Sequence, residues 1–210
     1  MTRKSPPSPE HLAQLISARG GKSGTAAPKT APPKTVPQGP ARELVCGEID
    51  IRIGRDGTWY YHGSPIGRKR LVKLFASVLK REPDGQYVLE TPVEKGRIQV
   101  DDVPFVAVEL TTAGAGEELV LTLRTNLDEF VTVGAGNPIR VASDPETGHP
   151  VPYVHVRDGL DARIARPVYY ELVELGMERR HGKDHLYGVW SKGEFFVLGE
   201  LTEPELTEQA

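Results

Sequence analysis

The chain has 210 residues, enough for one or two small domains with hydrophobic cores. Its formal net charge of −3 supplies no bulk attraction to nucleic acid or to an anionic membrane, and its single cysteine, Cys46, excludes an intramolecular disulfide. No apolar run approaches the roughly 18 residues that span a bilayer, and no secretory signal follows Met1. We therefore expect a cytoplasmic protein.

The first 40 residues differ in composition from the rest. They hold 8 of the 18 prolines, and their six basic residues face a single acidic one, Glu10. Ser8 and Pro9, followed by an apolar stripe, predict a short capped helix, whereas residues 20–40 are typical of a flexible linker. Residues 1–40 are thus either a solvated tail or a docking helix on a tether.

A first domain is predicted at residues 41–112. Isoleucines at every second position of residues 48–53, before an Asp56-Gly57 turn signal, predict a hairpin over residues 47–66. Residues 67–81 predict a helix, because apolar side chains recur at helical spacing: Leu71, Leu74, Phe75, Val78 and Leu79. Strands are predicted at residues 87–90, 97–100 and 104–111.

A second domain is predicted at residues 113–203, before a polar tail at 204–210. Alternating or β-branched runs predict strands at residues 119–123, 130–133, 139–141 and 152–156. A helix is expected from about Asp158 to Leu175, which Pro167 either kinks or restarts. A final hairpin is predicted over residues 186–201.

The two halves repeat a pattern of strands, helix and strands. This predicts an α+β fold of two small antiparallel sheets, each with one packing helix, and a degenerate duplication.

Three arginines are the strongest candidates for binding: Arg157, Arg163 and Arg166. On a predicted helix, Arg163 and Arg166 share one face near its N-terminal half. Arginine side chains beside a helix N-terminus favour a phosphate or carboxylate. The alternative is that these arginines form surface ion pairs with the many acidic residues.

Other polar motifs carry weaker signals. Asp101 and Asp102 are adjacent on a predicted strand, so their side chains point to opposite faces. His181 and His185 have a spacing that a helix could use for a metal, but Gly182 argues against a helix there. We therefore predict no catalytic residue, no metal site and no cofactor.

Several longer runs together resemble one family of uncharacterised bacterial proteins, the domain-of-unknown-function 1285 (DUF1285) family. The runs are Gly47–Ile53, Asp56–Ile66, Arg68–Leu79, Leu89–Lys95 and Val100–Phe105. Thr125-Asn126, Pro152-Tyr153, Arg157, Leu160–Ala162 and Arg166 extend the similarity through the second half. The resemblance covers roughly residues 45–200, and the runs Thr-Pro-Val-Glu-Lys and Val-Asp-Asp-Val-Pro-Phe are its most specific part.

The resemblance implies a duplicated two-domain fold whose C-terminal half is superficially pleckstrin-homology-like. It also implies a nucleotide-type ligand between the domains and a place in signalling, but no reaction. The site residues it implies are Thr91, Pro92, Glu94, Lys95 and Asp102 from the first half, facing Arg124, Asn126, Arg157 and Arg166 from the second.

We therefore expect a ligand-binding or signalling module for an anionic or nucleotide-like small molecule rather than an enzyme. One alternative is a metal-assisted hydrolase using Asp101 or Asp102 together with Glu94. Another is a protein–protein adaptor that recruits its partner through the C-terminal domain or the tail. We expect no binding to membranes and no direct binding to duplex nucleic acid.

Overall fold

The computed structural model describes residues 45–92, 94–182 and 184–201, so the predicted N-terminal helix and both tails lie outside the described residues. The described chain divides into two compact units. The first comprises residues 45–51 and 61–99, and the second comprises residues 52–60 and 100–201. This division falls earlier than the predicted boundary at residue 113, because the strand that precedes that residue pairs within the second unit.

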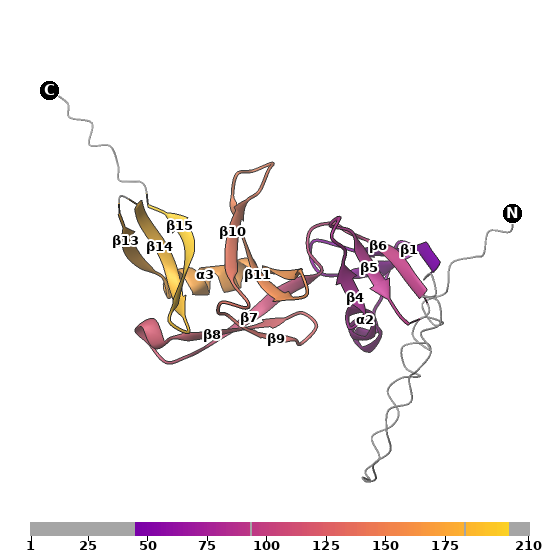
Figure 1. Cartoon of the computed structure of the whole chain (residues 1–210), viewed down its shortest axis with the longest axis horizontal. Helices are drawn as coiled ribbons and strands as arrows, with labels where there is room; N and C mark the ends of the chain where they lie inside the picture. The colour runs from indigo at the N-terminus through magenta and orange to yellow at the C-terminus, as the bar shows by residue number, and fades with distance from the viewer. Residues whose placement is uncertain (1–44, 93, 183, 202–210) are drawn as a thin grey trace, which may run out of the picture. The chain divides into compact units, whose positions relative to one another are not determined.

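The first six strands form one sheet in the order β3-β2-β1-β6-β5-β4, of which β1, β6, β5 and β4 are labelled in Figure 1. They are β1 (Val45–Ile53), β2 (Trp59–Tyr61), β3 (Ser64–Pro65), β4 (Leu79–Arg81), β5 (Tyr87–Glu90) and β6 (Glu94–Val100). The predicted hairpin over residues 47–66 is confirmed, and its isoleucines Ile49, Ile51 and Ile53 are buried. Its turn, at Arg55 to Gly57, belongs to the second compact unit.

The helix of the first unit is shorter than predicted. Helix α2 (Lys69–Ala76) buries Val72 and Phe75 and ends where the Ser77 hydroxyl donates a hydrogen bond to the Leu74 carbonyl. The prediction that this helix continues to residue 81 is wrong. Leu79 instead begins β4 and pairs with Leu89 of β5, so an apolar residue at helical spacing is buried by a strand.

The next six strands form a second sheet, in the order β10-β11-β12-β7-β8-β9. They are β7 (Phe105–Ala113), β8 (Val120–Thr125), β9 (Phe130–Thr132), β10 (Ile139–Ser143), β11 (Pro150–Arg157) and β12 (Leu160–Ile164), with the 3-10 turn η1 (Gly116–Glu118) before β8. The central neighbours β7 and β12 run parallel. Phe105, Leu123 and Ile164 of this sheet are fully or almost fully buried.

The predicted helix over residues 158–175 is wrong in its first half. Asp158 and Gly159 have φ angles of 47° and 74°, so they form the two-residue turn that an Asp-Gly pair favours. This turn joins β11 to β12, and α3 (Arg166–Glu174) begins only after Ala165. Pro167 lies in the first turn of α3, where the missing N–H costs no helical hydrogen bond.

A small third sheet completes the second unit. It contains β13 (Met177–His181), β14 (Asp184–Ser191) and β15 (Glu194–Glu200), of which the last two confirm the predicted hairpin. The fully buried Ser191 joins it to the large sheet, because its hydroxyl accepts from the Leu121 N–H (3.1 Å) and donates to the Val133 carbonyl (2.8 Å). Helix α3 contacts both β7 and β14.

The described residues are thus mostly β-structure with two α-helices, which agrees with an α+β class in outline. The prediction of purely antiparallel sheets is wrong. Both large sheets are mixed. In the second sheet β7 pairs in parallel with β12. In the first sheet the neighbours β1 and β6 end side by side, where the Asp101 N–H donates to the Ile53 carbonyl, so they also run parallel. Neither described helix is long and apolar enough to cross a membrane.

Candidate anion-binding site

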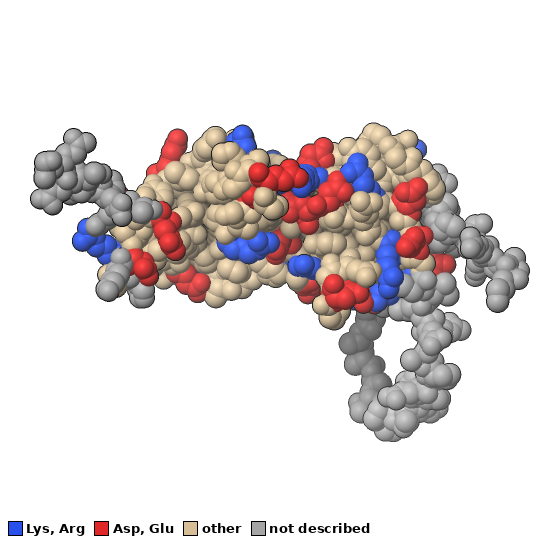
Figure 2. Space-filling model, turned by 90° about the horizontal axis from the view of Figure 1, so that it is seen from above, with Lys and Arg blue, Asp and Glu red and all other residues tan. Residues whose placement is uncertain are grey.

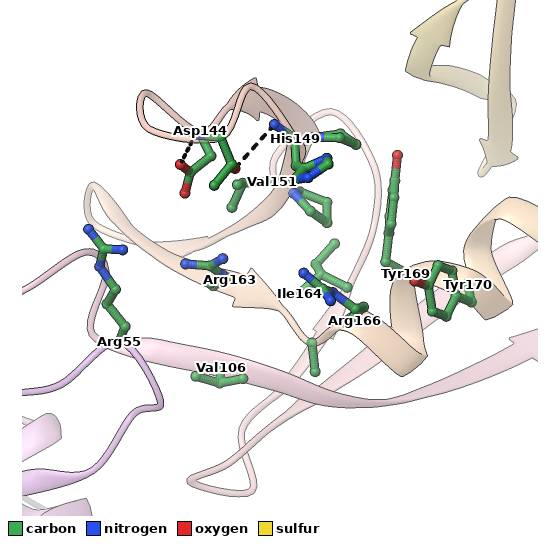
Figure 3. Close-up of a pocket in the computed structure, with 14 residues that line it drawn as sticks. Arg55, Val106, Asp144, His149, Val151, Arg163, Ile164, Arg166, Tyr169 and Tyr170 are labelled. Atoms are coloured by element: carbon green, nitrogen blue, oxygen red, sulfur yellow. Dashed lines mark hydrogen bonds between the residues drawn. The ribbon is translucent and has the colours of Figure 1, made fainter.

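A pocket of about 550 Å³ lies within the second unit (Figure 3). The turn of the first hairpin, the end of β12, the start of α3 and the loop between β10 and β11 all contribute to it. Its lining residues are Arg55, Val106, Asp144, Thr147, His149, Pro150, Val151, Pro152, Arg163, Ile164, Ala165, Arg166, Tyr169 and Tyr170. A volume of this size is typical of small-molecule sites.

Three arginines reach this pocket from three different elements. Arg55 comes from the β1–β2 turn, Arg163 from the end of β12, and Arg166 is the first residue of α3. Figure 3 shows these side chains along one side of the pocket, opposite the β10–β11 loop. Because β12 leads directly into α3, the local chain path brings Arg163 and Arg166 to the same cavity although only Arg166 is helical.

The three arginines differ in how their charges are balanced. One N–H of Arg163 donates to an Asp102 carboxylate oxygen at 3.2 Å. Arg166 is exposed, and no hydrogen bond or ion pair joins it to any residue that the structure describes. The pocket therefore presents one uncompensated guanidinium group next to a partly compensated one.

Asp102 is held in place by a second donor, the Tyr153 hydroxyl, at 3.0 Å. Burial of the phenol raises the pKa of Tyr153 above its ordinary value, and the hydrogen bond to Asp102 and the charge of that carboxylate raise it further. Tyr153 is therefore a neutral donor near neutral pH. This chain of contacts fixes the position of Arg163 at the pocket.

The opposite wall of the pocket carries the acidic residue Asp144. Its Oδ1 accepts hydrogen bonds from the backbone N–H groups of Glu146 and Thr147, each at 3.0 Å. These bonds lower the pKa of Asp144 below its ordinary value, and the positive charge of Arg55 lowers it further. Asp144 is therefore an ionised acceptor under physiological conditions.

Two tyrosines continue the lining along α3. Tyr169 and Tyr170 lie three and four positions after Arg166, so all three side chains share one helix face. Burial raises the pKa of Tyr169. The apolar residues Val106 and Val151 add hydrophobic surface to the same lining, so the site combines cationic, aromatic and aliphatic groups.

The predicted site residues of the second half are mostly outside this pocket. Arg124 binds the carboxylates of Glu109 (2.5 Å) and Asp128 (3.0 Å), and Arg157 binds Glu129 (2.8 Å). Figure 2 shows the same interspersion of basic and acidic side chains on the visible face. Of the predicted residues, Arg166 lines the pocket and Asp102 contacts it through Arg163.

Asn126, also predicted, has a structural position. Its side-chain amide donates to the Gly57 carbonyl at 3.2 Å, and its Oδ1 accepts from the Val106 N–H at 3.1 Å. These bonds join the turn that carries Arg55 to β7, which supplies Val106 to the pocket. Asn126 therefore supports the wall of the site without lining it.

Apart from Asp102, the predicted residues of the first half lie around the turn between β5 and β6. The buried Thr91 hydroxyl accepts from the Glu94 N–H and donates to the Glu94 carbonyl, each at 3.0 Å, and Pro92 is exposed. Lys95 pairs with Glu82 at 2.7 Å. Oε2 of Glu94 is buried without a hydrogen-bond partner among the described residues. The predicted juxtaposition of these residues with the arginines of the second half stays a prediction.

The two aspartates that the hydrolase alternative offers as partners of Glu94 pair with different arginines. Asp101 pairs with Arg52, whereas Asp102 pairs with Arg163. Within residues 45–92, 94–182 and 184–201, no cluster of three or more His, Cys, Asp or Glu side chains has the arrangement of a metal site. His185 contacts Glu178 at 2.9 Å across the β13–β14 pair.

Arg55, Asp144 and His149 were not predicted as site residues. Each lies in a loop whose sequence signal indicates a turn, and turn composition does not tell which cavity the turn borders. Pro167 indicates where a helix begins. This signal could have placed Tyr169 and Tyr170 near the start of that helix, on the same face as Arg166.

Comparisons with known proteins agree with the resemblance seen in the sequence. Residues 42–103 match "Domain of unknown function (DUF1285), N-terminal domain", and residues 104–198 match "Protein of unknown function (DUF1285), C-terminal domain". The crystal structure of a DUF1285 family protein from Silicibacter pomeroyi DSS-3 is 43% identical, with a TM-score of 0.75, and the alignment covers 94% of this chain and 97% of that one.

A DUF1285 family protein from Shewanella baltica OS155 is 28% identical over 60% of this chain and 91% of that chain, with a TM-score of 0.48. No curated protein matches the chain significantly. The two domain matches and the 43% identity over nearly the whole length lead to one conclusion. This chain belongs to the DUF1285 family.

Proposed function

We propose that this protein binds an anionic small molecule in the pocket formed by Arg55, Arg163 and Arg166. The observation that carries the proposal is Arg166, whose guanidinium lies on the pocket and has no ion-pair partner among the described residues. Elsewhere the arginines Arg124 and Arg157 are each balanced by carboxylates.

Several physical features support an anion as the ligand. The N-terminal turn of α3 presents backbone N–H groups and the positive end of the helix dipole next to Arg166. Arg163 uses one of its five N–H donors for Asp102, so further donors remain for a ligand. A phosphate or carboxylate group can accept charge-assisted hydrogen bonds from both guanidinium groups.

The class of function is binding rather than catalysis. The pocket contains donors and aromatic surface, and a nucleotide-like ligand with a role in cytoplasmic signalling is one member of the class that would fit. The metal-assisted hydrolase would need converging carboxylates, and Asp101 and Asp102 contact different arginines instead. The adaptor alternative involves the N-terminal tail, which lies outside the described residues.

The shared strand order of the two large sheets supports the predicted duplication. Each sheet consists of two groups of three consecutive strands, and the two strands that meet at its centre run parallel. The predicted likeness of the second half to pleckstrin-homology domains stays a prediction.

Isothermal calorimetry with inorganic phosphate tests the proposal. We expect binding to the unmodified protein and a loss of about 10-fold or more in affinity for Arg166→Gln, because one charge-assisted hydrogen bond contributes about 1.5–3 kcal/mol. Arg140→Gln is the matched control, since Arg140 is an exposed arginine outside the pocket and pairs with Asp161. Equal affinities in the two variants, or no binding to the unmodified protein, would rule the proposal out.

A further inference from the structure

The pocket has a second polar wall that the binding of an anion does not use. Asp144, Thr147 and His149 belong to the β10–β11 loop, and Figure 3 shows Asp144 and His149 opposite the arginines. A site for a bare anion gains nothing from a carboxylate, because two negative charges in one cavity repel each other. The presence of Asp144 on the lining therefore indicates that the ligand has a second chemical group beside its anionic group.

Asp144 is built to stay an ionised acceptor. The backbone N–H groups of Glu146 and Thr147 both donate to Oδ1. The Thr147 side chain also forms a hydrogen bond with this carboxylate, but a carboxylate has about four lone-pair sites, so it retains acceptor capacity toward the pocket. An ionised carboxylate can only accept, so the matching ligand group has to be a donor.

The charge of Arg55 decides between the two kinds of donor. Arg55 lies on the same pocket and is close enough to Asp144 to lower the pKa of that carboxyl group. An ammonium group that approached Asp144 would also meet the positive charge of Arg55, which offsets its attraction to the carboxylate, and it would lose hydration as well. A neutral hydroxyl group donates to Asp144 without this penalty.

The size of the pocket fits a ligand with both parts. A cavity of about 550 Å³ is larger than one phosphate ion needs and lies in the range of sites for small organic molecules. The arginines and the Asp144 loop occupy opposite walls of it, so an anionic group at one wall leaves space for a hydroxyl-bearing part at the other.

We propose that Asp144 selects ligands that carry hydroxyl groups beside their anionic group, so that the natural ligand is a hydroxylated organic anion such as a phosphorylated sugar or polyol. This proposal rests on the proposed anion-binding function and names its specificity-determining residue. Hydroxyl groups would donate to the Asp144 carboxylate while the anionic group binds Arg163 and Arg166. The same chemistry occurs in free sugar phosphates and in nucleotides.

Calorimetry with two matched ligands tests the proposal. Ribose 5-phosphate and pentyl phosphate have the same anionic group and similar length, but only the first has hydroxyl groups. We expect ribose 5-phosphate to bind at least about 10-fold more tightly, since a hydrogen bond to a charged group contributes about 1.5–3 kcal/mol. Pentyl phosphate that binds as tightly, or phosphoethanolamine that binds more tightly than ribose 5-phosphate, would overturn the proposal.

The Asp144→Asn variant tests whether Asp144 causes the preference for ribose 5-phosphate over pentyl phosphate. The asparagine Oδ1 can still accept from Glu146 and Thr147, so the loop keeps its bonds. We expect this variant to lose the preference for ribose 5-phosphate and to bind inorganic phosphate at least as tightly as the unmodified protein, because one negative charge leaves the pocket. Asp161→Asn is the control, because Asp161 pairs with Arg140 and His155 outside the pocket. A preference that survives in Asp144→Asn would contradict the assignment.

These measurements distinguish a failure of the proposed anion binding from a failure of the proposed role of Asp144. If inorganic phosphate, ribose 5-phosphate and pentyl phosphate all fail to bind, the proposed function itself fails. If all three bind without a preference, only the role of Asp144 fails. A comparison of AMP with ribose 5-phosphate then distinguishes the sources: tighter binding of AMP indicates a nucleotide, and equal or weaker binding indicates a free sugar phosphate.

Discussion

The two large sheets have the same strand order and differ in where their helix is inserted. Counted from its own first strand, each sheet has the order 3-2-1-6-5-4. In the first sheet α2 connects the third strand, β3, to the fourth, β4, both of which are edge strands. In the second sheet α3 follows the sixth strand, β12, which lies at the centre.

The different positions of α2 and α3 in their sheets explain why the basic residues at their starts have different surroundings. Both helices begin with basic residues, Lys69 and Arg70 in α2 and Arg166 in α3. The first two are exposed and are not among the residues that line the candidate pocket, whereas Arg166 borders it. A helix that leaves a central strand places its first turn beside the neighbouring strand ends and loops, and this arrangement creates the concave site.

The largest expected effect comes from deleting the buried side chain of each helix. Phe75 of α2 and Leu172 of α3 are fully buried, so Phe75→Ala should cost about 3–5 kcal/mol and Leu172→Ala about 2–5 kcal/mol of stability. Chemical denaturation measures both. Only Leu172→Ala should also weaken phosphate binding, because a cavity beneath α3 lets Arg166 shift. An equal loss of phosphate affinity in Phe75→Ala would contradict the prediction that only α3 supports the phosphate site.

A smaller effect is expected at the turn that carries Arg55. Asn126→Ala removes the two side-chain bonds to Gly57 and Val106, and should cost about 1–3 kcal/mol and weaken phosphate binding several-fold. Asn137 is a matched control, since its amide donates to the carbonyls of His155 (3.0 Å) and Val156 (2.8 Å) and does not border the pocket. Asn137→Ala should lose stability and keep its phosphate affinity. Unchanged affinity in Asn126→Ala would show that Arg55 is not needed.

Tyr153→Phe should have a moderate, pH-dependent effect. Loss of the bond to Asp102 should cost about 0.5–1.5 kcal/mol at neutral pH. The pKa of Tyr153 is raised in the folded state, so its contribution is fully present below the unfolded pKa of about 10 and is lost as pH rises through the folded pKa. Denaturation curves of both proteins should therefore converge in strong alkali. A constant difference at all pH values would refute the role of the neutral phenol.

The smallest effect is expected for Asp144→Asn in acid. The pKa of Asp144 is lowered in the folded state, so its contribution to stability is present above the unfolded pKa of about 3.9 and is lost as pH falls through the folded value. Thermal unfolding should show the variant slightly less stable than the unmodified protein at pH 6, and equally stable at the acid end. A variant that is more stable at pH 6 would contradict the loop bonds.

The sequence predicted local structure best where one signal was unambiguous. Asp56-Gly57 between two apolar strands predicted the first hairpin correctly, and the terminal hairpin was equally clear. Asp158-Gly159 carries the same turn signal, but the apolar residues on both sides of Pro167 also fit a helical period, and strand β12 was missed. Periodicity alone does not distinguish a short buried strand from a helix when tertiary contacts decide.

The candidate site was predictable only in part. Arg163 and Arg166 were recognised as candidates from their sequence, although the reason given for their proximity, a shared helix, was wrong. Arg55 and Asp144 reach the same pocket from distant loops, and no local pattern encodes that meeting. Arg157 was a reasonable candidate that the fold pairs with Glu129 instead, since the choice of ion-pair partner depends on strand pairing.

The position of a bound anion shows whether Arg163 and Arg166 form one binding site. Arginine Nε–Hε signals, followed by NMR during a titration with inorganic phosphate, report which guanidinium groups the anion contacts. We predict that Arg163 and Arg166 shift together with one dissociation constant, while Arg68 and Arg70 at the start of α2 stay unchanged. The largest shifts at Arg68 and Arg70, with Arg163 and Arg166 unchanged, would contradict the account.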